Sequence, residues 1–134
     1  MKQNLAVIFS LTAVLTAGAI NHVYSAEADR VAAAKNDAVK VEEVFAKKDA
    51  LNGKKITVKG EVVKFNSSIM GKNWVHIKDG SGKPGTNDLT ATTNDTANVG
   101  DKVVVTGTLA VGKDFGAGYK YEAIMEEATI TPLK

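Results

Sequence analysis

Residues 54–80 read KKITVKGEVVKFNSSIMGKNWVHIKDG, and this stretch contains the pattern from which the fold class follows. Ile56 and Val58 alternate with polar residues, which indicates a strand with one buried face. Gly60 interrupts this pattern, and the apolar neighbours Val62 and Val63 follow it, which indicates a bend or bulge. A long strand that changes its buried face is what a small closed barrel requires. We therefore expect one curved strand over 55–65, a loop over 66–73 and a second strand over 74–78.

The sequence on either side of this stretch supplies one helix and three more strands. Val41, Val44 and Phe45 lie on one stripe of an amphipathic pattern, and Asn52-Gly53 follows as a stop signal, so we expect a helix over 37–51. Glycine-rich and polar clusters separate the remaining apolar runs. The further strands are expected at 88–93, 102–111 and 119–131, with a loop over 112–118 and a helical turn capped by Asn94 or Asp95. The prediction is one all-β domain with an N-terminal helix, over residues 37–134.

The first 36 residues have a different composition. Lys2 precedes an uncharged apolar run from Leu5 to Ile20, and small residues follow it near Ser25, so we expect a cleaved signal peptide over 1–25 and a periplasmic protein. A retained membrane anchor is the alternative, although this run is short for a span. The Ala-rich, charged residues 26–36 are expected to form a flexible segment.

Composition excludes several classes of function. The chain has no cysteine, which removes disulfides, zinc–thiolate sites, iron–sulfur clusters and covalent haem attachment. The formal net charge of +2 falls to about +1 without Lys2, which disfavours nucleic acid as a partner. Catalysis has little support, because His76 is the only histidine after the leader and adjacent acid pairs diverge. We expect no enzymatic activity and no catalytic residue.

The predicted order of one helix and five strands resembles the OB-fold, a five-stranded Greek-key barrel. Three segments carry the resemblance: GKKITVKGEVV at 53–63, NWVHIKDGSG at 73–82 and VGDKVVVTGTL at 99–109. The second of these is similar to the strand-two signature of OB domains that bind tRNA anticodons. The resemblance covers about residues 39–130 and implies a ligand face on the second and third strands, between the loops at 66–72 and 112–118.

A closer resemblance is to the NrfJ family of small periplasmic OB-fold proteins, which are encoded beside a multihaem cytochrome c nitrite reductase. The segments IMGKNWVHIKDG, DLTATTNDTANVGD and DFGAGYKYEAIMEEA carry it. It implies an accessory role toward a periplasmic protein partner, either a multihaem respiratory cytochrome or its assembly machinery. Fold alone does not decide function.

Rare side chains gather around the second strand of this predicted barrel. Trp74 and His76 are two residues apart and should share a face, which we expect to point outward because Val75 and Ile77 are the better core residues. Aromatic residues of the last loop and strand, together with strand-two lysines, complete a candidate ligand surface. The predicted ligand-binding residues are Met70, Lys72, Trp74, His76, Lys78, Phe115, Tyr119 and Tyr121.

Two alternatives remain open for this surface. Thioether and imidazole groups suit Cu(I), and a Trp face can cover such a cation, so Met70, His76 and Met125 form a candidate copper site. The patch resembles OB-fold copper chaperones in residue types and departs from them in spacing. Otherwise no cofactor is expected. The second alternative is a nucleic-acid or oligosaccharide ligand that stacks on the aromatic residues. In the simplest interpretation, these aromatics and Met70 only pack the barrel.

Overall fold

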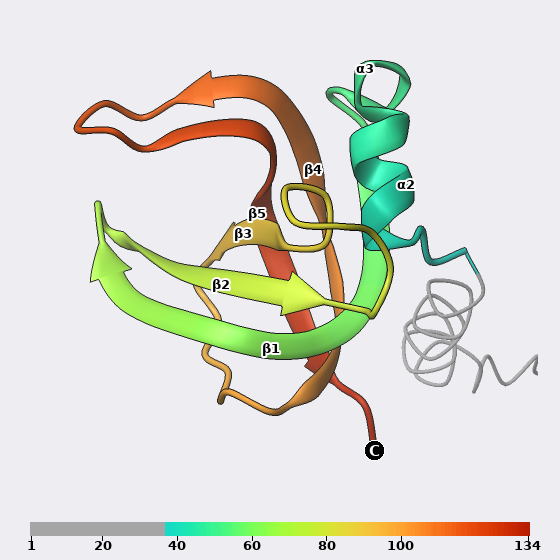
Figure 1. Ribbon diagram of the computed structural model, residues 1–134. Helices are drawn as coiled ribbons and strands as arrows, with labels where there is room; N and C mark the ends of the chain where they lie inside the picture. Colours follow the sequence, from blue (N-terminus) through green and yellow to red (C-terminus); the bar gives the residue numbers. More distant parts are fainter. Residues whose placement is uncertain (1–36) are drawn as a thin grey trace, which may run out of the picture.

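The computed structural model of the protein describes residues 37–134 (Figure 1). The predicted signal peptide over 1–25 and the flexible segment over 26–36 lie outside the described residues. Five strands form one sheet that closes into a barrel in the order β1-β2-β3-β5-β4, so the predicted closed five-stranded sheet is confirmed. The strands are β1 (Lys55–Ile69), β2 (Lys72–Lys78), β3 (Leu89–Thr93), β4 (Lys102–Asp114) and β5 (Lys120–Pro132).

The long first strand holds the barrel together because it pairs with two partners in turn. Its first half runs antiparallel to β4, from Lys55 opposite Thr108 to Glu61 opposite Lys102. Its second half runs antiparallel to β2, beginning where Glu61 lies opposite Lys78. The barrel then closes through β3, which is antiparallel to β2 and parallel to β5.

The change of partner coincides with the bend that the sequence predicted. A Cβ atom on Gly60 would lie 2.5 Å from Cγ2 of Ile77 and 2.6 Å from the carbonyl oxygen of Lys78, so only glycine fits where β1 meets the end of β2. The register shifts between Val62 and Lys64, which confirms the predicted bulge.

The core fills the inside of the barrel and continues under the helices. Its members are mostly β-branched and aliphatic, as the alternation in β1 and β4 requires. Val41 and Val44 close one end of the barrel and are fully buried. The fully buried core includes Val58, Val62, Val75, Ile77, Leu89, Val103, Val105, Leu109 and Met125.

The predicted single helix over 37–51 is wrong in extent. The structure has α2 (Val41–Ala46) and α3 (Lys48–Leu51), separated at Lys47. The preceding residues are extended, because the Val39 N–H donates to the Thr57 carbonyl at 2.8 Å and holds the chain against β1. The first turn begins at Val41, whose N–H donates to Oδ2 of Asp79 at 2.9 Å.

The predicted loops at 66–73 and 112–118 are also too long. Strands β1 and β2 continue to a two-residue turn at Met70 and Gly71, with φ of 51° and 74°. The strong turn signal Asn-Gly is absent here, so no local pattern indicated so tight a hairpin. In the second hairpin, β4 and β5 leave only residues 115–119 between them.

The predicted helical turn at Asn94 or Asp95 does not form. The side chain of Asp95 instead accepts a hydrogen bond from the Ile130 N–H at 2.8 Å, and its carbonyl accepts one from Asn73 at 2.9 Å. These contacts hold the start of the connector, which is not helical, against β5 and β2.

Gly60→Ala tests the close approach of β1 and β2. Because the backbone of Lys78 must shift to admit the new methyl group, we expect a loss of about 1–3 kcal/mol in the free energy of unfolding. Urea denaturation measures it, with Ser67→Ala, an exposed site in the same strand, as the matched control at under about 0.5 kcal/mol. Equal stability of the two variants would contradict a steric role for Gly60.

Candidate functional site

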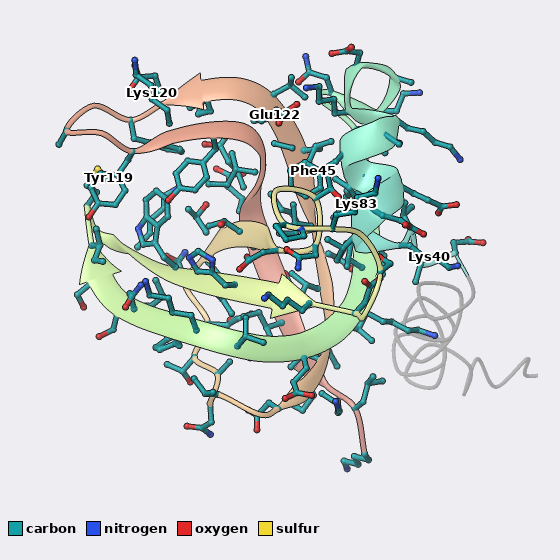
Figure 2. The ribbon with its side chains drawn as sticks, in the orientation of Figure 1. Lys40, Phe45, Lys83, Tyr119, Lys120 and Glu122 are labelled. Atoms are coloured by element: carbon teal, nitrogen blue, oxygen red, sulfur yellow. The ribbon has the colours of Figure 1, made fainter. Side chains whose placement is uncertain are left out.

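Two hairpins extend from the same end of the barrel and lie one above the other (Figure 1). One is formed by β1 and β2, and the other by β4 and β5. Tyr119, at the base of the second hairpin's turn, lies between them near the tip of the first (Figure 2). The space between the hairpins is occupied by aromatic side chains, which we call the aromatic cluster: Trp74, Phe115, Tyr119 and Tyr121.

The aromatic cluster is centred on the indole of Trp74. Its ring centroid lies 5.1 Å from that of Phe115 in an edge-to-face contact, 5.8 Å from Tyr119 and 5.7 Å from Tyr121. Phe115 and Tyr121 also meet edge to face at 6.0 Å. Aromatic pairs at such distances each contribute about 0.5–1.5 kcal/mol beyond their buried area, so the cluster holds the two hairpins together.

Trp74 lies on the outer face of β2, as expected, but it is buried there. Its side chain does lie on the face opposite Val75 and Ile77, but the second hairpin covers it and the residue is only 3% exposed. Its Nε1–H donates to the carbonyl of Ile69 at 2.8 Å, which fixes the indole against the first hairpin. Strand alternation predicted the face correctly, but it could not show what covers that face.

Hydrogen bonds within the turn of the second hairpin hold its aromatic residues facing the first hairpin. The Phe115 N–H donates to the Tyr119 carbonyl, and the Tyr119 N–H donates to the Gly116 carbonyl, each at 2.9 Å. Gly116 has a positive φ of 82°, which glycine tolerates without strain. The Asp114 side chain accepts the Gly116 N–H at 2.8 Å. The ammonium group of Lys113 lies 5.5 Å from the centroid of Phe115 on the same hairpin.

His76 shares the outer face of β2 with Trp74, as the sequence predicted, because the pairing of β2 with β3 is unbroken between them. Its Nδ1 donates to Oδ1 of Asp88 at 2.9 Å. Sequence reasoning missed Asp88 as a partner; its place just before β3, the antiparallel neighbour of β2, was the available signal. The pair orients the imidazole, and both side chains are part-exposed.

The three residues of the candidate copper site are not brought together. Met125 is fully buried inside the barrel, opposite Leu109 and Ala91, whereas His76 lies on the outer face. Met70 lies at the turn of the first hairpin and is 53% exposed. His76 is four residues along β2 from the tip pair, or about 13 Å at the usual rise of a strand. Within residues 37–134 there is no group of three or more His, Cys, Asp or Glu suited to a metal.

The predicted lysines are divided between the two ends of β2. Lys72 is exposed beside the turn of the first hairpin, next to Met70. Lys78 is exposed at the opposite end, about 20 Å away along the strand, and does not belong with the aromatic cluster. The exposed part of the candidate site is therefore the pair of hairpin tips, with Met70, Lys72 and Tyr119, the last 37% exposed.

No protein-family model matches the sequence, and no curated protein matches it either. No helix within the described residues 37–134 is long and apolar enough to cross a bilayer.

Within the aromatic cluster, the pKa of Tyr121 is shifted by its surroundings. Burial raises the pKa of its hydroxyl above the ordinary value of 10.0, and the neighbouring Tyr119 raises it further. The neutral hydroxyl is therefore favoured in the folded protein. This contribution to stability is complete below pH 10 and is lost as the pH rises through the raised pKa.

A spectrophotometric titration of tyrosine ionisation tests this packing. We expect one tyrosine to ionise above the ordinary value, and we expect Tyr121→Phe to remove that component. Tyr119→Phe should leave it in place but at a lower pH, because the charge of the neighbouring tyrosinate is gone. If the Tyr121→Phe titration retains the late component, the cluster is not packed as described.

Proposed function

We propose that this protein is a non-enzymatic periplasmic binding module with an OB-fold, and that it binds a protein partner through the tips of its two hairpins. The partner class we favour is a multihaem respiratory cytochrome or its assembly machinery, in line with the resemblance to the NrfJ family. The observation that carries the proposal is the aromatic cluster, which fixes two hairpins so that Met70 and Tyr119 emerge together from a rigid base.

The strand order supports the OB-fold as the finer description of the barrel. An OB-fold is a five-stranded Greek-key barrel whose ligands bind over strands two and three, between the first and the last hairpin loops. In this chain the barrel order is β1-β2-β3-β5-β4, and the aromatic cluster occupies the space between those hairpins. A large ligand cannot enter this space without displacing the rings. This favours recognition by the exposed residues at the hairpin tips, Met70, Lys72 and Tyr119, which we call the hairpin rim.

The side chains on this rim favour binding over catalysis. Methionine is flexible and polarizable, and it adapts to irregular protein surfaces. Tyrosine provides a large contact area with a polar end, and it is enriched at binding hot spots. Met70 adopts φ of 51° and Ser68 φ of 57°, and non-glycine residues with such values are often found at functional sites. Held by a fixed scaffold, this rim loses little entropy on association.

Removal of the two exposed rim side chains tests the proposed interface. In the double variant Met70→Ser/Tyr119→Ser we expect the affinity for a purified multihaem cytochrome c nitrite reductase to fall by about tenfold or more, since truncated hot spots cost about 2 kcal/mol. Surface-immobilised binding measures it. Val99→Ser is the matched control, because Val99 is an exposed apolar residue of the β3–β4 connection and is 66% exposed.

Different results would assign the site to another ligand or surface. Equal affinities of the double variant and the control would reject the rim as the interface. If Cu(I) quenched Trp74 fluorescence stoichiometrically and Met70→Ser abolished this quenching, the results would favour a copper carrier. If the protein bound single-stranded DNA in a salt-dependent way and the double variant lost this binding, the results would favour a nucleic-acid ligand.

A further inference from the structure

A second surface lies at the other end of the barrel, beside α2 and away from the hairpin tips. It is an open groove of about 840 Å³ bounded by the extended residues 38–40, β1, the end of β2 and the chain end near Leu133. Lys40, on its border, lies at the foot of α2 (Figure 2). The apolar parts of its lining come from Ala38, Val39, Val63 and Leu133.

The groove is a gap in the edge of the sheet. The Val39 N–H donates to the Thr57 carbonyl at 2.8 Å, so the backbone groups of Thr57 point away from β4. Backbone groups alternate along a strand, so Lys59 also directs its N–H and C=O to this edge. The next partner on this edge is Lys78, opposite Glu61. The structure shows no hydrogen bond to the N–H or C=O of Lys59 from residues 37–134.

Positive charge surrounds this gap. Four lysines line the groove: Lys40, Lys59, Lys78 and Lys102. Of the two carboxylates there, Glu61 pairs with Lys102, and Asp79 is held by Val41 and Ser81. Burial of the Asp79 carboxyl opposes its ionisation, but hydrogen bonds from the Ser81 side chain and from the backbone of Val41 and Ser81 lower its pKa overall. Lys40, Lys59 and Lys78 form no ion pair with any of residues 37–134.

We infer that this groove binds an extended acidic segment of a protein partner. The N–H and C=O of Lys59, which have no partner among residues 37–134, match the backbone of an extended peptide, which is the chemistry of strand addition at a sheet edge. Alternate side chains of such a peptide face the same way, so acidic residues at every second position reach the lysines on the rim of the groove. A polyanion without a peptide backbone would satisfy the lysines only. The site is separate from the hairpin rim and does not depend on its function.

The test uses the isotopically labelled protein and a heptapeptide of alternating glutamate and threonine. We expect saturable chemical-shift changes at the amides of Lys59 and Lys78. In Lys59→Gln/Lys78→Gln we expect the affinity to fall about threefold to tenfold, because exposed ion pairs each contribute modestly to binding in water. The matched control is Lys54→Gln/Lys55→Gln, which removes two exposed lysines outside the groove. Thermal unfolding of both variants verifies that they fold.

Three further probes distinguish strand addition in the groove from non-specific attraction of the peptide to lysines. The same heptapeptide with N-methyl groups on alternate residues should bind more weakly, because it cannot pair with both backbone groups of Lys59. Glutamine in place of glutamate should also weaken binding. Tyr119→Ser, at the hairpin rim, should leave the affinity for the heptapeptide unchanged.

Specific outcomes would overturn the inference. Shift changes spread over lysines across the whole surface, or equal affinity in the groove variant and its control, would reject the groove as a site. Equal binding of the N-methylated heptapeptide would reject backbone pairing. If a sulfated oligosaccharide bound with the same dependence on Lys59 and Lys78 while the heptapeptide did not bind, the occupant would be a polyanion and not a protein segment.

Discussion

The bend of β1 at Gly60 makes closure of the barrel possible, and both surfaces of the protein are arranged around it. At this point the strand leaves β4 and joins β2, and Glu61 lies opposite Lys102 on one side and Lys78 on the other. Because Gly60 has no side chain, the end of β2 can pack directly against the backbone of β1. Without that approach, the sheet would stay open and its core side chains would face water.

The same bend separates the two surfaces of the protein. Beyond Gly60, β1 continues with β2 to the first hairpin, whose outer face carries Trp74. Before Gly60, β1 has β4 on one edge, and among the described residues only the chain around Val39 lies on the other, which leaves the gap at Lys59. The hairpin tips expose a thioether, a phenol and one lysine, whereas four lysines line the groove, so the two surfaces suit partners of different chemistry.

Part of the outer face of the barrel is buried, because the aromatic cluster covers it. Outer-face residues such as Thr92 and Ile124 are almost wholly buried, because the second hairpin folds over β2 and β3. The hydroxyl of Thr92 is buried with no hydrogen-bond partner among the described residues. The protein therefore has a second apolar layer outside its barrel, in which Trp74 is buried, Phe115 and Tyr121 are part-exposed and Tyr119 is exposed. This arrangement gives a rigid rim in place of an open cleft.

Local patterns in the chain were enough to predict five successive strands and the face of β2 on which Trp74 and His76 lie. Alternation in β1 and β4 and the break at Gly60 predicted the barrel and its bulge, because side chains on a strand alternate between its two faces. The contacts between distant segments emerged only from the folded chain: Phe115, Tyr119 and Tyr121 cover Trp74, Asp88 binds His76, and Met125 lies inside the barrel away from Met70. Such contacts depend on strand register, hairpin length and curvature, which no local pattern encodes.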